Sequence, residues 1–131
     1  MAARSRHQFR IKRVYEELLP EDGKRFLIDR LWPRGISKKA LSSVQWLPEV
    51  APSPALRNWF GHDPAKWPEF QKRYRLELKN NASAWAPLLE AIRESDVTLL
   101  FGSRNIENNQ AVVLKGFLEE KIRSKKNKQK P

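Results

Sequence analysis

Apolar runs at three places in the chain have the side-chain patterns of β-strands. Residues 9–15 alternate apolar and basic side chains, which is the two-residue period of a strand that buries one face. Residues 26–32 start with consecutive apolar side chains, and residues 97–101 are rich in β-branched and apolar ones, as in fully buried strands. Pro33 and Gly35 end the second strand, because proline cannot donate to a sheet ladder and glycine permits a sharp turn.

Helix signals dominate the middle of the chain. Ser53-Pro54 and Asp63-Pro64 each combine an N-cap residue with a proline suited to the first helical turn, and Gly61 ends the first of these helices. Apolar side chains spaced by three or four residues over 67–78 give the second helix one apolar stripe. Pro68 either kinks that helix or moves its start later along the chain.

Further helices are expected on either side of these two. Ser37 can cap a short helix that runs through Leu41, and Ser83 can cap a helix whose apolar residues point inward. A last helix begins near Asn108 or Asn109, directly after the strand of residues 97–101 and a short polar loop. A strand, a short loop and a helix in this order are half of a parallel α/β unit.

The pattern as a whole predicts an α/β fold, with one small domain and a mostly parallel three- to four-stranded sheet flanked by helices. Residues 16–24 connect the first two strands and are fewer than the ~10–12 residues of a crossover helix. These strands are therefore either an antiparallel pair or a parallel pair with an abbreviated connection. We expect a basic N-terminal arm at residues 1–8, the α/β domain at 9–122 and a basic flexible tail at 123–131.

The net charge of +11 comes from the two ends of the chain. Residues 1–13 and 121–131 carry basic side chains and no acidic ones, whereas the residues between them carry equal numbers of both. A basic run of this kind is most often a solvated tail. It can also bind RNA, DNA or another acidic surface weakly and in a salt-dependent way.

Composition excludes several classes of protein. The chain has no cysteine and two histidines, so it has no disulfide, no thiolate site and no histidine-rich metal centre. We expect no metal and no cofactor, since dinucleotide and P-loop fingerprints are absent as well. No apolar run approaches the ~20 residues of a membrane helix, and the basic N-terminus lacks the apolar block of a secretory signal. We therefore expect a soluble cytoplasmic protein that does not contact membranes.

Polar side chains gather where the strands of residues 26–32 and 97–101 end. Ligands of open α/β sheets bind outside the carboxyl ends of the strands. Arginine presents a planar, permanently charged fork to phosphate or carboxylate, and tryptophan presents a flat stacking surface. The sequence therefore predicts an anion pocket with an aromatic wall for a nucleotide or phosphorylated small molecule. Its expected ligand-binding residues are Arg30, Trp32, Arg34, Lys38, Arg57, His62, Arg104 and Asn109.

Asp29 and His62 are the candidates for acid–base catalysis, and His62 is the one of them that ordinarily titrates near pH 7. Each has a structural alternative. Asp29 can form an ion pair with one of the arginines, and His62-Asp63 before Pro64 can serve as a helix cap. The tryptophans have a structural alternative too, as parts of the core. We expect Trp32 to be partly exposed, and the others to be buried: Trp46, Trp59, Trp67 and Trp85.

Longer motifs resemble a known family. They include Ile11-Lys12-Arg13-Val14-Tyr15, Asp29-Arg30-Leu31-Trp32-Pro33-Arg34-Gly35-Ile36-Ser37-Lys38 and Trp59-Phe60-Gly61-His62-Asp63-Pro64. The pattern resembles the YeaO-like group of the family numbered 488 among domains of unknown function, DUF488, over about residues 9–120. The resemblance implies a small, mostly parallel α/β fold of bacterial and archaeal cytoplasmic proteins, without an established activity.

The chain departs from the family pattern after the strand of residues 97–101. The resemblance implies two alanines, a basic residue and an aspartate there, followed by an asparagine flanked by histidines. This chain has Gly102-Ser103-Arg104-Asn105 and then Asn108-Asn109-Gln110. Amides cannot do acid–base work near neutral pH, but they can hydrogen-bond a ligand. The departure therefore favours binding over catalysis.

Three functions remain open. The first, which we favour, is a protein that binds a small anionic molecule in the pocket, with or without catalysis. The second is a nucleic-acid-binding protein that uses both basic ends. The third is an interaction module in which the region from Trp59 to His62 docks another protein.

Overall fold

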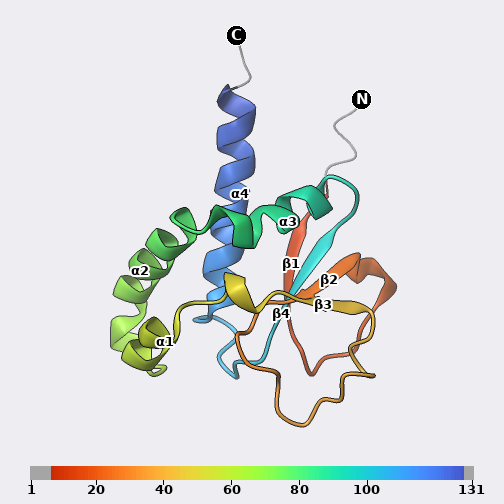
Figure 1. The fold of residues 1–131 in the computed structure, drawn as a ribbon, viewed down its shortest axis with the longest axis horizontal. Coiled ribbons are helices and arrows are strands. Elements are labelled where there is room, and N and C mark those ends of the chain that lie inside the picture. Colours follow the sequence, from red (N-terminus) through yellow and green to blue (C-terminus); the bar gives the residue numbers. More distant parts are fainter. Residues whose placement is uncertain (1–6, 129–131) are drawn as a thin grey trace.

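The sheet contains four parallel strands. The protein is described by a computed structural model that covers residues 7–128 (Figure 1). The strands are β1 (Phe9–Arg13), β2 (Lys24–Leu27), β3 (Val44–Trp46) and β4 (Val97–Phe101), in the order β1-β4-β2-β3. Every pairing is parallel. The predicted α/β class and the mostly parallel sheet are therefore confirmed.

Strand β4 lies between the first two strands of the chain. Leu99 pairs with Ile11 of β1 on one side and with Phe26 of β2 on the other. The chain passes from β1 to β2 through a 3-10 turn at Pro20–Asp22, without a crossover helix. Of the two arrangements that the short connection left open, the structure has the parallel one, with a third strand inserted between the two.

The helices are α1 (Pro54–Phe60), α2 (Trp67–Lys79), α3 (Ala82–Ile92) and α4 (Gln110–Lys128), and Figure 1 shows them gathered on one side of the sheet. The predicted caps of the first two are present. Ser53 accepts a hydrogen bond from the Leu56 amide, and Gly61 ends α1 in the left-handed conformation. Asp63 caps a separate 3-10 turn, so α2 starts later than the cap and Pro68 lies in its first turn.

Alternate side chains of the strands enter two separate cores. In β2 and the residue after it, Phe26 and Ile28 belong to the large core under the helices, whereas Leu27 belongs to a small core on the opposite face. Loop residues cover that second face, and they include Leu18, Trp32, Ile36 and Leu41. Helices therefore cover one face of the sheet and loops cover the other. The carboxyl edge of the sheet remains as the place for a binding site.

Two local predictions need correction. The short helix expected from Ser37 to Leu41 is a series of turns, although the Ser37 hydroxyl does accept a hydrogen bond from the Ala40 amide at 3.1 Å. The segment that ends at Trp46 is strand β3, and the Trp46 side chain is 37% exposed instead of buried. Its ring stands edge-on against Trp32, with the ring centroids 5.4 Å apart. Trp85 is buried as predicted, and Trp59 and Trp67 are partly buried against the large core.

The structure describes only part of each end of the chain. Residues 1–6 and 129–131 of the predicted arm and tail lie outside the described residues. Helix α4 continues past residue 122 to Lys128, so it includes part of the segment predicted as a tail. Within residues 7–128, no helix is long and apolar enough to cross a membrane.

Gly23 is expected to tolerate substitution much less well than Gly35. Both have a positive φ, of 69° and 80°, which side-chain-bearing residues rarely adopt, so alanine is strained at either position. A Cβ atom at Gly23 would lie 2.0 Å from the Asp96 carbonyl oxygen, whereas one at Gly35 would meet nothing within 4 Å. We expect Gly23→Ala to lose about 1–3 kcal/mol more than Gly35→Ala in urea denaturation, because backbone must shift. Equal losses would contradict this account of the β2 start.

Candidate functional site

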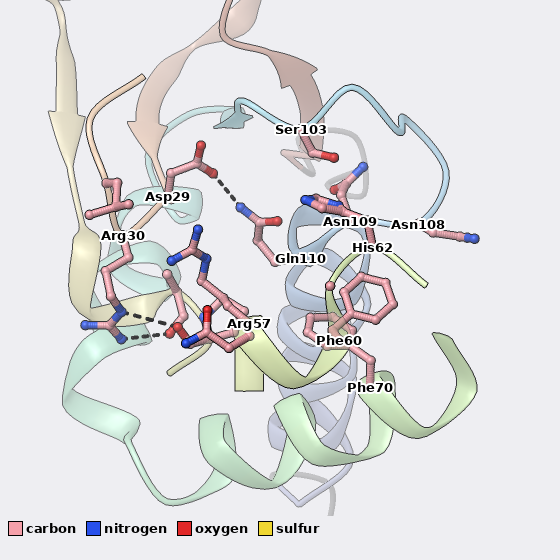
Figure 2. A pocket seen from close by; sticks show the side chains of 15 residues that line it. Asp29, Arg30, Arg57, Phe60, His62, Phe70, Ser103, Asn108, Asn109 and Gln110 are labelled. Atoms are coloured by element: carbon pink, nitrogen blue, oxygen red, sulfur yellow. Dashed lines mark hydrogen bonds between the residues drawn. The ribbon is translucent and has the colours of Figure 1, made fainter. Parts of the chain in front are cut away.

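A cavity of about 400 Å³ opens at the carboxyl ends of β2 and β4 (Figure 2). It is lined from several parts of the chain: the residues after β2, the end of α1, Phe70 of α2, the loop after β4 and the start of α4. This is the edge of a parallel sheet at which ligands ordinarily bind. The predicted residues that line the cavity are Asp29, Arg30, Arg57, His62 and Asn109.

Asp29 is held at the inner side of the cavity by two hydrogen bonds. The Gly102 amide donates to Oδ2 at 2.8 Å, and Gln110 Nε2 donates to Oδ1. A Cβ atom at position 102 would lie only 2.8 Å from the same Oδ2, so the absence of a side chain permits the close approach. The end of β4 and the start of α4 therefore fix this carboxyl group jointly.

Asp29 makes no ion pair with the described residues. Burial raises the pKa of its carboxyl group to about 6, although the Gly102 amide, the Arg57 charge and the Gln110 amide act in the opposite direction. The structure therefore does not support the alternative in which Asp29 is neutralised by a neighbouring arginine.

Arg30 has a structural role in the wall of the cavity. Its Nε donates to the Pro52 carbonyl at 3.2 Å, and its Nη2 donates to the Ala51 carbonyl at 3.1 Å. A third nitrogen lies 3.9 Å from the Glu49 carboxylate. These contacts hold the segment before α1 against the end of β2.

Arg57 projects from the last turn of α1 into the cavity, and Figure 2 shows its guanidinium group pointing toward Asp29. The guanidinium has no hydrogen-bond or ion-pair partner within residues 7–128. His62 follows at the rim, and its φ of 60° places it in the left-handed conformation directly after Gly61. The cap of the following turn comes from Asp63, whose Oδ1 accepts the Ala65 amide at 3.0 Å, so His62 itself is not used as a cap.

The amide side chains of the loop after β4 build the start of α4. Buried Asn109 accepts the Ala111 amide at 2.9 Å through Oδ1 and donates to the Asn105 carbonyl at 2.8 Å through Nδ2. Asn105 in turn accepts the amides of Glu107 and Asn108. Both side chains therefore have partners within the chain, and each satisfies backbone groups that a helix start leaves open.

The other predicted ligand residues lie away from the cavity lining. Trp32 packs in the small core on the opposite face, where its Nε1 donates to the Ile36 carbonyl at 2.6 Å. Arg34 and Lys38 are exposed on the loop that follows, and the Tyr15 hydroxyl donates to the Arg34 carbonyl at 2.9 Å. Arg104 is exposed on the loop after β4. The predicted set is thus divided between the cavity and the outer face of the loops.

Comparison with known proteins places the chain in a family. Residues 8–131 match the family described as the inactive DUF488-N3 subclade. The chain belongs to this DUF488 family. An uncharacterized protein of Mycobacterium tuberculosis is 41% identical over 109 residues, which cover 83% of this chain and 92% of the relative. The uncharacterized protein YeaO of Escherichia coli is 36% identical over 107 residues, covering 82% and 93%. No solved structure matches.

The match confirms the resemblance to the YeaO-like group of DUF488 proteins. The match also concerns Gln110, which the sequence did not predict as part of the site. Gln110 stands where the resemblance implies a histidine, and it donates to Asp29. The sequence signal was the departure from the DUF488 pattern itself, but nothing in the sequence indicated that Asp29 would be the partner. Phe60 and Asn108 were likewise missed as lining residues.

The raised pKa of Asp29 predicts a specific dependence of stability on pH. The value of about 6 lies above the ordinary 3.8, so the folded state binds the proton more tightly than the unfolded state does. The stability gained from protonated Asp29 is present below about pH 4 and is lost as the pH rises through about 6. Asp29→Asn does not ionise, and a rotated Gln110 amide can accept its N–H. We expect the free energy of unfolding of this variant, relative to the unchanged protein, to rise by about 1–2 kcal/mol between about pH 5 and about pH 8.

Asp96→Asn is the control for this measurement by urea denaturation. Hydrogen bonds from the Gln8 amide and Arg10 lower the pKa of Asp96 below its ordinary value. The stability that Asp96 contributes is present above about pH 4 and is lost only at lower pH. Its removal should therefore give a constant difference from the unchanged protein over the same range. A constant difference for Asp29→Asn as well would contradict the raised pKa.

Proposed function

We propose that the cavity binds a small anionic molecule, a nucleotide or another phosphorylated metabolite, and that Arg57 is its main anion-binding residue. The observation that carries this proposal is the guanidinium of Arg57, which points into the cavity without a partner among the described residues. A guanidinium offers five N–H donors in a planar fork, which matches phosphate or carboxylate oxygens. Arg30 is less suited to this role, because two of its donors are held by the carbonyls of Ala51 and Pro52.

The size and the other walls of the cavity support an organic ligand with a ring. A volume of about 400 Å³ is within the ~300–1,000 Å³ range of small-molecule sites. Phe60 and Phe70 stack with their centroids 4.4 Å apart and form an apolar wall. Ser103 and Asn108 add polar groups on the opposite side. This mixture of an apolar wall and a few polar groups is typical of ligand pockets.

We favour binding over catalysis at this site. Asp29 and His62 are the titratable candidates for acid–base work, but Asp29 is already engaged by Gly102 and Gln110. Gln110 and Asn109 cannot exchange protons near neutral pH. The description of the matched family as inactive supports the same choice. Asp29 then orients the ligand, and His62 contacts it at the rim.

Arg57→Ala should weaken anion binding, whereas Arg34→Ala should not. Nucleoside monophosphates and sugar phosphates are expected to raise the melting temperature of the unchanged protein by binding its folded state. Loss of charge-assisted hydrogen bonds at Arg57 should weaken the affinity about tenfold or more in titration calorimetry. Arg34→Ala removes the same charge outside the cavity and leaves the backbone carbonyl that Tyr15 contacts. Absence of any shift across the anion panel, or equal losses in both variants, would contradict the proposal.

A second candidate function, nucleic-acid binding, is favoured by a basic groove of about 480 Å³ between α2 and α4. Lys72, Lys79 and Lys121 line it, and its remaining basic residue, Arg75, pairs with Glu120 at 3.0 Å. The phosphates of a nucleic acid would meet several cations in this groove.

Replacement of two groove lysines tests this second function. We expect Lys72→Gln with Lys79→Gln to weaken the binding of a mixed-sequence single-stranded oligonucleotide and to reduce the salt dependence by about 1–2 phosphate contacts. The matched control is Lys38→Gln with Lys39→Gln, which removes the same charge from an exposed loop elsewhere. Fluorescence anisotropy at several salt concentrations measures both. Equal weakening by the two pairs would show that only the net charge matters.

The third hypothesis, docking of a protein on the region from Trp59 to His62, has less support. The Arg73 guanidinium lies 4.1 Å from the Trp59 ring centroid and the Lys66 ammonium 5.1 Å from it, so neighbouring cations cover this ring. The cytoplasmic location stays a prediction from the sequence.

A further inference from the structure

The hydrogen-bond capacity of Asp29 limits what can bind against it. An ionised carboxylate has two oxygens and about four acceptor positions. Within the described chain, Oδ2 accepts one hydrogen bond, from the Gly102 amide, and Oδ1 accepts one, from Gln110. Each oxygen therefore keeps acceptor capacity. A ligand with two parallel N–H groups can donate to both oxygens at once, in the geometry that makes bidentate pairs strong.

The protein itself does not occupy this position. No arginine or lysine of the described chain forms an ion pair with Asp29, and Arg57, which also lines the cavity, acts on it only as a charge. Figure 2 shows Asp29 at one side of the cavity and the Arg57 guanidinium directed toward it from the end of α1. A ligand between them meets an acceptor pair on one side and a cationic donor fork on the other.

We propose that the occupant presents a planar pair of adjacent N–H donors to Asp29 and an anionic group to Arg57, and that a guanine nucleotide is the class that fits. The inference rests on the proposed anion-binding function and names its ligand. The 2-amino-6-oxopurine ring carries N–H and NH₂ side by side on one edge. Phe60 and Phe70 give this ring an apolar wall, and the phosphate extends to Arg57 and His62 at the rim.

Other bases fit the same carboxylate less well for a physical reason. Adenine and cytosine place a ring-nitrogen acceptor beside their amino group, and this acceptor would face a carboxylate oxygen without a proton between them. Hypoxanthine has the ring N–H but lacks the adjacent amino group. Xanthine has a carbonyl oxygen in place of that amino group. A site that is built to accept hydrogen bonds discriminates strongly against a ligand that leaves its buried acceptors unpaired.

Calorimetry with four nucleotides on the full chain tests the inference. We expect guanosine monophosphate to bind at least about tenfold more tightly than inosine, adenosine or xanthosine monophosphate, since one charge-assisted hydrogen bond or more is lost in each. Asp29→Asn should reverse the order in favour of xanthosine monophosphate, because the new amide donates to the xanthine carbonyl and accepts from its ring N–H. Arg57→Ala should weaken all four by a similar factor and keep their order.

The outcomes separate this inference from the function on which it rests. Equal affinities of the unchanged protein for the four nucleotides, or a preference for adenosine monophosphate, would overturn the guanine assignment while Arg57-dependent binding persists. No Arg57-dependent binding of any anion would overturn the proposed function itself. The order in the unchanged protein decides the question even if Asp29→Asn does not fold. 4-Guanidinobutyrate carries the same donor fork on a smaller acid, so tighter binding of this compound would replace the nucleotide by a guanidino acid.

Discussion

The burial of β4 is the constraint on which the rest of the structure depends. Every residue of this strand is buried, and it pairs with β1 on one side and with β2 on the other. Even its polar residue is accommodated, since the Thr98 hydroxyl donates to the Asp22 carbonyl at 2.7 Å. The chain leaves the core at Gly102, directly after β4. At this point the Gly102 amide donates to Asp29. The position of the cavity therefore follows from the central strand.

Asp22 and Asp29, near the two ends of β2, show how an ion-pair partner changes the pKa of a buried carboxyl group. Burial alone would raise the pKa of Asp22, but hydrogen bonds from Lys12, Arg25 and the Leu19 amide outweigh it and lower the pKa to about 2. Those partners use its acceptor positions and close the start of β2. Asp29 has the burial without a paired cation, since Arg57 acts on it only as a charge, and its pKa moves the other way, to about 6. A buried carboxylate without a paired cation destabilises the fold. The proposed ligand would offset part of this cost by donating hydrogen bonds to Asp29.

The sequence predicted the parts of the fold that depend on local chemistry. The caps at Ser53, Gly61 and Asp63 and the buried strand β4 follow from residue types within a few positions, and they are present. Strand order is not local, because β4 follows β2 by three helices along the chain and yet lies between β1 and β2 in the sheet. The arrangement of the site could not be predicted for the same reason, because it too depends on contacts between distant parts of the chain. The loop after β2 has no periodicity, so its sequence could not show that Trp32 points to the opposite face from Asp29.

The amides after β4 have structural roles of their own. If the loss of acid–base residues implied by the resemblance had merely emptied the site, polar groups without partners would remain in it. Instead, Asn105 and Asn109 organise the start of α4, and Gln110 holds Asp29 in place. Among the described residues, no buried side-chain polar atom lacks a hydrogen-bond partner. The guanidinium of Arg57 faces the cavity without a partner among the described residues, and Asp29 keeps acceptor positions beside its two hydrogen bonds.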